Sequence, residues 1–340
     1  MKQWQRYLRF CLTSDFLTIA GRGSDFALAL FIIMIIALMI IPVPAWIMDI
    51  FLVLNITVAA TILLVSVYIA NAMKISTFPT LLLITTLLRL SLNISTTRLI
   101  LLDGYAGEVI NSFGQFVVRG NYIVGAVVFF IITVVQFIVI ARGAERVAEV
   151  AARFTLDAMP GKQMSIEADM RAGLITIEEA RKRRLMLERE SQFYGAMDGA
   201  MKFVKGDAIA GIIIILVNIT GGILIGLLIK QMTFMEALGV FMLLTVGDGL
   251  VSQIPALLIS SSAGIVITRV ESEDETSSLG REISRQILRQ PRALVVASGL
   301  LAGFAFVPGL PFLPFVLLAV ITGSTAIGLL KMKPHVPVQK

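Results

Sequence analysis

Two ionisable residues lie inside long apolar runs, where a charge is unfavourable unless it has a partner or serves a function. Arg89 lies near the middle of the run 78–102, and Asp248 lies between two glycines near the centre of the run 235–268. A charge at mid-bilayer costs about 2.5–3.5 kcal/mol even on lenient insertion scales, so such residues mark ion pathways or pairs that join helices. For Arg89 we weigh a static pair with a carboxylate against a role in conduction. For Asp248 we weigh proton or ion binding against a salt bridge, for which Arg89 is the obvious partner.

Polar side chains accompany Arg89 along one face of its expected helix. They follow at spacings of three and four, and they are Thr85, Asn93 and Thr96. This stripe predicts that the face meets the protein interior or an aqueous path, because lipid would leave its polar groups without partners. Arg98, nine residues after Arg89, falls on the opposite face near the outer boundary. There its long side chain can reach the interface by snorkelling.

Asp207 stands where the apolar run 207–229 begins, and an acidic residue at that place is an ordinary helix N-cap. Helix–helix hydrogen bonding is the simplest role for four other polar residues of the runs, namely Asp49, Asn55, Gln136 and Asn218. Gly222 and Gly226, four residues apart, indicate a face on which two helices pack closely.

Covalent catalysis finds no support in the sequence. Cys11 is the one cysteine and His335 the one histidine, so neither a Cys/His zinc cluster nor a Ser/His/Asp set can be assembled. Gly161-Lys162 matches part of a phosphate-loop motif, but Leu156 and Gln163 occupy the places of the required glycine and hydroxyl residue. We therefore predict a protein that is not an enzyme and that has no metal or cofactor, with transport or gating as its task.

The composition indicates a polytopic membrane protein of the all-α class. Hydrophobic residues make up 57% of the 340 residues, charged residues 15%, and the mean hydropathy is +0.88. A helix needs about 20 apolar residues to cross roughly 30 Å of hydrocarbon. Eight spans are predicted, at 26–43, 47–70, 78–102, 121–141, 207–229, 235–268, 292–308 and 312–330.

Prolines indicate how some of these spans begin and connect. Pro42 and Pro44 predict a tight turn between the first two spans, and the proline-rich run 307–311 predicts another between the last two. Both pairs are expected to form hairpins. Pro79 is expected in the first turn of the third span, where a helix tolerates proline.

The sixth of these runs, 235–268, is longer than one ordinary span. As a single helix it would reach about 51 Å, at 1.5 Å per residue. We expect it to be tilted, extended into water or broken. Gly247, Gly249 and Pro255 supply the chemistry for a break, because glycine loosens a helix and proline removes a backbone hydrogen bond.

Lys and Arg residues set the expected topology. With the N-terminus in the cytoplasm, most of the 29 basic residues fall on the cytoplasmic side, as the positive-inside rule requires. Both termini are then cytoplasmic, and the net charge of +6 attracts anionic lipid, not nucleic acid. The segments are a cytoplasmic start 1–25, spans one to four 26–141, a cytoplasmic insertion 142–206, spans five and six 207–268, a cytoplasmic loop 269–291, spans seven and eight 292–330, and the start of a linker 331–340.

The insertion between the fourth and fifth spans, residues 142–206, is too long and too charged to be a connector. We predict a small cytoplasmic domain there. Residues 177–193 mix apolar and charged positions, which is typical of a water-exposed helix with neighbouring ion pairs. Its charges are either a solvated face or a docking surface for neighbouring subunits or export partners.

Long motifs in this sequence resemble one family. They are Thr-Thr-Leu-Leu-Arg-Leu-Ser-Leu-Asn-Ile-Ser-Thr-Thr-Arg at 85–98, Glu-Arg-Val-Ala-Glu-Val-Ala-Ala-Arg-Phe at 145–154, Leu-Asp-Ala-Met-Pro-Gly-Lys-Gln-Met-Ser-Ile at 156–166, Asp-Gly-Ala-Met-Lys-Phe-Val-Lys-Gly-Asp at 198–207 and Val-Gly-Asp-Gly-Leu-Val-Ser-Gln-Ile-Pro at 246–255. Together they are similar to the membrane part of the large export-gate proteins of type III secretion, the FHIPEP family. The motifs are closer to those of the virulence injectisome branch than to those of the flagellar branch.

The resemblance implies a homo-oligomeric ring, commonly ninefold, in the bacterial inner membrane, which uses proton-motive force to export unfolded effector and needle proteins. A passive anchor for a cytosolic substrate-receptor ring is the alternative. The implied partners are other membrane proteins of the export apparatus. In the family, chaperones, substrates and the ATPase stalk bind a large cytosolic domain that follows the last span and is absent from these 340 residues.

The resemblance also assigns roles to charged positions. It implies a functional role for Asp207 beyond capping a helix, and one for Arg98 beyond reaching the interface by snorkelling. The expected ion or proton coupling set is Arg89, Arg98, Lys202, Asp207 and Asp248. The expected functional or interface set of the insertion is Arg146, Arg153 and Asp157.

Overall fold

The computed structural model describes residues 25–118, 120–269, 279–288, 290–307 and 310–331. Within these ranges the chain consists of helices and connecting turns, without strands, which confirms the all-helical prediction. Cys11, His335 and most of the predicted cytoplasmic ends lie outside the described residues. The chain forms two compact units, one of residues 1–66 with 71–270 and one of residues 67–70 with 271–340.

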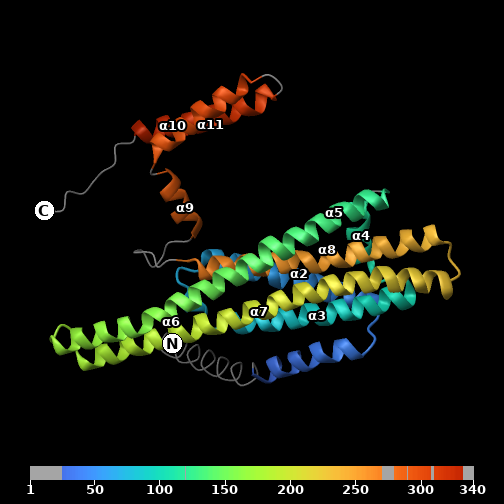
Figure 1. The fold of residues 1–340 in the computed structure, drawn as a ribbon, viewed down its shortest axis with the longest axis horizontal. Helices are drawn as coiled ribbons and strands as arrows, with labels where there is room; N and C mark the ends of the chain where they lie inside the picture. Colours follow the sequence, from blue (N-terminus) through green and yellow to red (C-terminus); the bar gives the residue numbers. More distant parts are fainter. Residues whose placement is uncertain (1–24, 119, 270–278, 289, 308–309, 332–340) are drawn as a thin grey trace, which may run out of the picture. The chain divides into compact units, whose positions relative to one another are not determined.

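Each predicted apolar run lies largely within a helix, other helices lie outside these runs, and Figure 1 labels most of the helices. In chain order they are Asp25–Ile40, α2 Ala45–Tyr68, the 3-10 helix η1 Ala72–Ile75, α3 Phe78–Asp103, α4 Glu108–Val118, α5 Tyr122–Val135, the π-helix η2 Gln136–Ala141, α6 Arg142–Arg171, α7 Ile177–Leu228, α8 Phe234–Ile267, α9 Leu279–Leu288, α10 Pro291–Ala305 and α11 Phe312–Lys331.

Local sequence chemistry explains where these helices begin and end. Pro79 lies in the first turn of α3, as predicted, where its missing N–H costs nothing. Gly104 ends α3 in the left-handed conformation that glycine adopts without strain. Thr233 and Glu236 form a capping box at the start of α8. Thr176 caps α7, because its hydroxyl accepts a hydrogen bond from the Glu179 N–H at 3.2 Å.

Among the described residues, six helices are long and apolar enough to cross a membrane. They are α2, α3, α7, α8, α11 and the continuous helix Tyr122–Arg171. The first and seventh predicted spans correspond to shorter apolar helices, Asp25–Ile40 and Pro291–Ala305. The sixth run forms one unbroken helix of 34 residues, so Pro255 does not interrupt it. The helical membrane architecture thus rests on six long apolar helices and two short ones.

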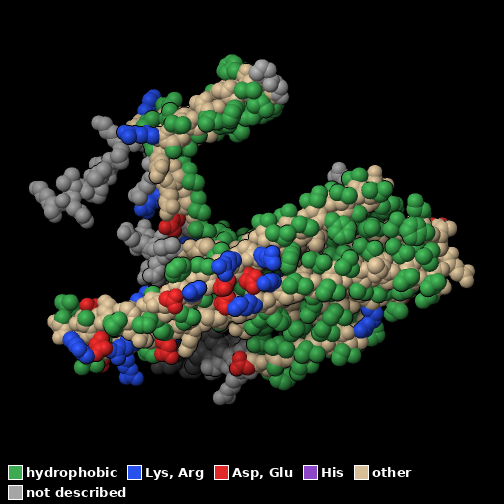
Figure 2. Space-filling view, viewed as in Figure 1, with side chains coloured by type: hydrophobic (Ala, Val, Ile, Leu, Met, Phe, Trp, Pro, Cys, Tyr) green, Lys and Arg blue, Asp and Glu red, His purple; other side chains and the backbone are tan. Residues whose placement is uncertain are grey.

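Two helices are far longer than a bilayer is thick. Tyr122–Arg171 has 50 residues and α7 has 52. At 1.5 Å per residue each extends about 75–78 Å, against roughly 30 Å of hydrocarbon. Their far ends pack together as a hairpin of α6 with the first half of α7, which comprises the predicted insertion 142–206 (Figure 1). Figure 2 shows Lys, Arg, Asp and Glu gathered along this hairpin, whereas the surface near α5 is mostly hydrophobic.

One sequence prediction about these elements is wrong, and one helix was not predicted. Asp207 is not an N-cap, because α7 begins at Ile177 and passes through Asp207 without interruption. The helix α4, which precedes the fourth span and whose buried residues pack against α8, was not predicted. The eleven residues of α4 are too few to appear as a span in a hydropathy reading.

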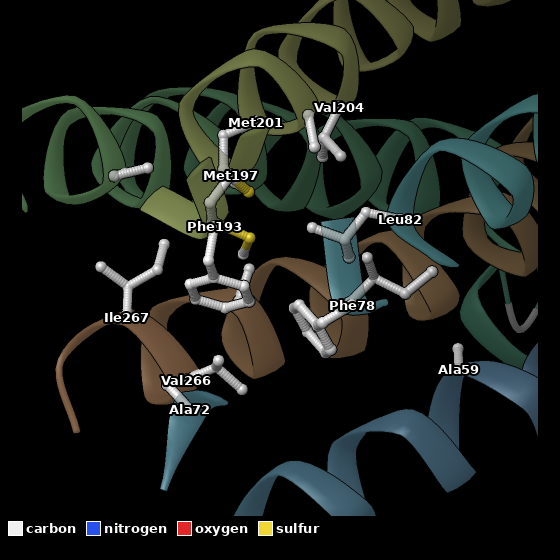
Figure 3. Packing of buried hydrophobic residues seen from close by; sticks show 14 residues of the cluster. Ala59, Ala72, Phe78, Leu82, Phe193, Met197, Met201, Val204, Val266 and Ile267 are labelled. Atoms are coloured by element: carbon white, nitrogen blue, oxygen red, sulfur yellow. The ribbon is translucent and has the colours of Figure 1, made fainter. Parts of the chain in front are cut away.

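One hydrophobic cluster joins the hairpin to the apolar helices. Phe193, Met197 and Met201 of α7 are buried against Phe78 of α3 and Val266 of α8, as Figure 3 shows. Burying such side chains stabilises a fold by about 1.5–3 kcal/mol each where water is the alternative. The cluster therefore holds the start of α3, the middle of α7 and the end of α8 in one position.

Glycines allow close helix approach on both sides of α8. A Cβ at Gly222 of α7 would lie 2.4 Å from the Phe241 ring, and one at Gly226 would lie 2.7 Å from the Ala237 Cβ. This confirms the predicted close-packing face. On the other side of α8, a Cβ at Gly247 would lie 2.0 Å from the Ile110 carbonyl oxygen of α4.

The second unit contains a helical hairpin. The helices α10 and α11 pack along each other, and the Ser298 hydroxyl donates a hydrogen bond to the Ala319 carbonyl at 2.8 Å. Phe304 and Phe315 meet edge to face, with ring centroids 6.1 Å apart. The predicted pairing of the last two apolar runs as a hairpin is therefore confirmed.

Candidate functional site

A buried ion pair joins α3 to α7. The Arg89 Nη2 donates to Asp207 Oδ2, and the two side chains are 3% and 5% exposed. The sequence suggested Asp248 as the partner of Arg89, and this prediction is wrong because the helix that packs along α3 at this level is α7. The stripe of Thr85, Asn93 and Thr96 is buried, as predicted.

Asp248 of α8 lies in the same region with neutral partners. Its Oδ2 accepts a hydrogen bond from Asn218 Nδ2 of α7 at 3.4 Å, and the Thr96 hydroxyl lies beside it. Within the described residues no basic side chain forms an ion pair with Asp248. The helix–helix hydrogen bond predicted for Asn218 is confirmed, and it ends on the site carboxylate.

All three charged side chains line one cavity of about 40 Å³. Since one water needs roughly 10–15 Å³, the cavity has room for about three. Its polar lining also includes Asn93 of α3, Thr133 of α5, Gln136 of η2, and Ser252 and Gln253 of α8. Several helices thus supply polar groups to one small volume.

Gln253 is a site residue that the sequence reasoning did not select. Its Nε2 donates to the Thr133 hydroxyl at 2.7 Å, which links α8 to α5 across the cavity. The available signal was an uncharged amide five residues after Asp248 in an otherwise apolar run. Polar groups at such depth are costly and therefore point to function or to helix pairing.

Several polar atoms of this cluster have no hydrogen-bond partner among the described protein atoms. They are Arg89 Nη1, Asp207 Oδ1, Asn218 Oδ1 and Gln253 Oε1. Buried polar atoms in native proteins nearly always have a partner, which can be protein or water. These four atoms are therefore the groups through which a small polar species, such as water or a proton carried by water, can interact with the site.

The cavity is connected to the α6–α7 hairpin by neighbouring contacts. Gln136 and Phe137, which line the cavity, belong to the π-helix η2, and such segments occur often at functional sites. The Arg142 guanidinium lies 5.9 Å from the Phe137 ring centroid. Glu145 of α6 accepts from Lys205 of α7 at 2.9 Å, two residues before Asp207. A shift of α7 at Asp207 would therefore act directly on the base of the hairpin.

Two residues of the expected coupling set lie outside the cavity. Lys202 is exposed on α7 and donates to Asp198 at 2.8 Å, and the hydrogen bond and charge of Asp198 raise the pKa of Lys202, so it stays cationic at neutral pH. Arg98 donates to the carbonyls of Met39 at 2.8 Å and Ile40 at 2.9 Å. It thus caps the end of the helix Asp25–Ile40, a contact more specific than snorkelling.

The three residues of the insertion set lie on the exposed surface of α6. Arg146 pairs with Glu149 at 2.6 Å. Arg153 pairs with Asp157 at 3.7 Å, with side chains 83% and 71% exposed.

Asp49, which the sequence predicted to join helices, does so at the start of α4. Its carboxylate accepts from the backbone N–H groups of Glu108 at 3.0 Å and Val109 at 3.1 Å. These N–H groups belong to the first turn of α4, which has no partners for them within the helix. Asp49 therefore fixes α4 to α2 outside the cavity.

Comparisons with known proteins agree on one group of relatives. The FHIPEP family profile matches residues 35–339. The chain is 52% identical over 309 residues to the low calcium response locus protein D of Yersinia pestis, with 91% of this chain and 44% of the relative covered. It is 58% identical over 302 residues to the hypersensitivity response secretion protein HrcV of Ralstonia nicotianae, with 88% and 44% covered.

A third relative is the secretion system apparatus protein SsaV of Salmonella typhimurium, 52% identical over 299 residues, with 88% of this chain and 44% of the relative covered. The chain thus spans less than half the length of these curated relatives. No solved structure gives a significant match.

Proposed function

The chain belongs to the FHIPEP family, and from this membership we propose that it builds the membrane part of the export gate of a type III protein secretion system. It crosses the bacterial inner membrane eight times, with both ends in the cytoplasm, and assembles as a homo-oligomeric ring. It couples proton-motive force to the export of unfolded proteins. The other parts of the apparatus, chaperones and substrates are its partners.

The observation that carries the coupling proposal is that one guanidinium and two carboxylates line the same cavity. Arg89 pairs with Asp207, and Asp248 lines the same cavity with neutral partners. An unpaired charge in a buried site is costly. The cavity stays neutral when Arg89 pairs with one carboxylate and the other carries a proton. The cavity therefore has two states of equal net charge, one with the proton on Asp248 and one with the proton on Asp207.

A transport cycle follows from these two states. A proton from the outer side occupies Asp248 while Arg89 holds Asp207, which is the pairing in this structure. Transfer of the proton to Asp207 frees Arg89 to move to Asp248. Release of the proton from Asp207 to the cytoplasm then draws Arg89 back, and the next proton from the outer side neutralises Asp248, which restores the starting state. Each proton that crosses 100 mV releases about 2.3 kcal/mol.

The mechanical output of the cycle is movement of the α6–α7 hairpin. Asp207 lies two residues from Lys205, which pairs with Glu145 of α6. Breaking and forming the Arg89 contact changes the force on α7 at this point. The continuous helix α7 transmits that displacement past the Phe193 and Met197 cluster to the hairpin.

Proton flux into vesicles tests the coupling. The chain is reconstituted in liposomes with an internal pH dye, and a potassium gradient with valinomycin sets the potential. Asp207→Asn and Asp248→Asn are expected to lower the flux at least tenfold, because neither amide can carry the proton. Asp49→Asn is the matched control, since its amide oxygen can still cap α4 outside the cavity.

Two outcomes would contradict coupling. One is a wild-type flux no greater than the lipid background, which would leave the passive anchor as the function. The other is unchanged flux in both cavity variants. In the full-length protein, Asp207→Ala is expected to stop secretion while ring assembly, followed by cross-linking, survives.

A further inference from the structure

The short helix α9 has two chemically different faces. At 3.6 residues per turn, Leu279, Ile283 and Ile287 fall on one side, whereas Arg281 and Arg285 fall on the opposite side. None of the ten residues of α9 is buried, and Ile283 and Ile287 are 47% and 57% exposed. A helix with a charged face and an apolar face of this kind is typical of segments that lie in a membrane surface.

The position of α9 in the chain keeps it close to the membrane. Leu288 ends α9 and Pro291 begins α10. At roughly 3.3–3.6 Å per extended residue, the chain between the two helices reaches about 10 Å at most. The first turns of α10 present exposed apolar side chains, among them Val295 and Val296. Where α10 enters the bilayer, α9 cannot lie far from its surface. This step rests on the eight-span arrangement proposed above.

Length and charge decide how α9 meets the membrane. Its ten residues extend about 15 Å, roughly half of the hydrocarbon thickness, so α9 cannot cross. Within α9 the charged residues are Arg281, Arg285 and Glu282, whose carboxylate accepts from Gln286 at 3.5 Å. Arg292 follows in α10, and four acidic residues precede α9 in the sequence, at 271, 273, 274 and 275. A basic polar face fits the anionic headgroups of the inner leaflet, which attract each Lys or Arg near the surface.

We propose that α9 lies flat in the cytoplasmic surface of the inner membrane, with Ile283 and Ile287 among the acyl chains and Arg281, Arg285 and Arg292 on anionic phospholipid headgroups. This contact sets the depth and rotation of α10 at its cytoplasmic end. The occupant of the apolar stripe is therefore lipid, and the strength of the contact depends on the fraction of anionic lipid.

Spin labels at single cysteines test the orientation in the full chain. On a Cys11→Ser background, Ile283→Cys and Ile287→Cys place labels on the apolar stripe, and Leu288→Cys places one on the opposite side, where the native side chain is also exposed. Val296→Cys on α10 reports whether that helix is in lipid. Vesicles contain phosphatidylcholine alone or with phosphatidylglycerol. Power saturation with oxygen and with a water-soluble nickel complex measures the exposure of each label to lipid and to water.

The labels at 283 and 287 are expected to respond to oxygen and to be protected from nickel, whereas the label at 288 responds to nickel. Replacing Arg281 and Arg285 by glutamine should lower the membrane-seated population roughly fivefold per arginine in vesicles with phosphatidylglycerol. Arg181→Gln with Arg184→Gln, on the exposed α7 surface, removes the same charge and should leave it unchanged.

The remaining outcomes overturn the proposal in separate ways. Labels on both faces that respond equally to nickel would place α9 in water. Labels at 283 and 287 shielded from both reagents would place a protein on the stripe. An α10 label that responds to nickel would instead overturn the span arrangement on which the proposal rests. Proton flux through the cavity is measured independently of all three.

Discussion

Two arginine–aspartate pairs in this protein use the same chemistry in opposite surroundings. Arg89 and Asp207 join two different helices, and their side chains are 3% and 5% exposed. Arg153 and Asp157 are four residues apart on one exposed helix, and their side chains are 83% and 71% exposed. The cavity pair is shielded from bulk water, whereas the hairpin pair is exposed to it.

The difference teaches that surroundings, not residue type, decide what such a pair can do. Exposed pairs contribute about 0–1 kcal/mol, because water and salt screen the charges. A buried pair gains more from attraction but also loses more hydration, so removing one partner is far more costly than removing both. A proton that neutralises Asp207 would therefore have a large effect on structure, and one that neutralises Asp157 would have almost none.

The largest expected effect comes from breaking the cavity pair on one side. Arg89→Ala or Asp207→Ala should lower the free energy of unfolding by about 3–5 kcal/mol, because each leaves an unpaired buried charge. Thermal unfolding in detergent micelles, followed by tryptophan fluorescence, measures the loss. The double variant Arg89→Leu with Asp207→Leu should recover most of it and still lack proton flux. Single variants no less stable than Arg153→Ala would remove the contrast between the two regions.

A second contrast concerns glycines of the same two regions. Gly247→Ala should cost about 1–3 kcal/mol, because backbone cannot move aside easily for an added methyl group. The new Cβ would overlap the Ile110 carbonyl oxygen of α4. Gly195→Ala on the hairpin meets no neighbouring atom, and it should stabilise its helix by up to about 1 kcal/mol. Chemical denaturation in micelles compares them. Equal effects of the two substitutions, or a stabilising Gly247→Ala, would argue against the close α4–α8 contact.

Arg98 tests whether a family-associated charge belongs to the cavity or to the scaffold. Arg98→Gln should cost about 1.5 kcal/mol, because hydrogen bonds from a charged donor are weakened. The bonds concerned are those to the carbonyls of Met39 and Ile40. Hydrogen exchange at the end of the helix Asp25–Ile40 should rise. Proton flux should stay near wild type, and a loss as large as that of Asp248→Asn would return Arg98 to the coupling set.

The smallest effect on stability is expected for the hairpin pair. A double-mutant cycle of Arg153→Gln and Asp157→Asn should give a coupling energy below about 0.5 kcal/mol, and added salt should reduce it further. Secretion by the full-length protein provides the second measurement. Lost secretion without lost stability would identify a docking surface, and unchanged secretion would leave a solvated face.

Helix positions in this protein were largely predictable, because each depends on composition over a short stretch. Long apolar runs and their Pro or Gly boundaries predicted α3, α8 and the second half of α7, and the burial of the Arg89 stripe followed from its spacing. The helix α4 was not predicted, because its burial depends on Gly114 and Gly247, which lie far apart in the chain. The unbroken α8 shows that Pro255 alone does not end a well-packed helix.

The three charged residues of the cavity were predictable from the sequence, but its uncharged lining and the connections between its members were not. By itself the sequence determined that Arg89 and Asp248 lie in apolar helices, because a run of about 20 apolar residues can be recognised from the order of residues alone. Tertiary structure decided that Arg89 pairs with Asp207, that Gln253 and Thr133 complete the cavity, and that Arg98 caps another helix. Those contacts depend on which helices pack together and at what height, and helix packing joins residues more than a hundred positions apart.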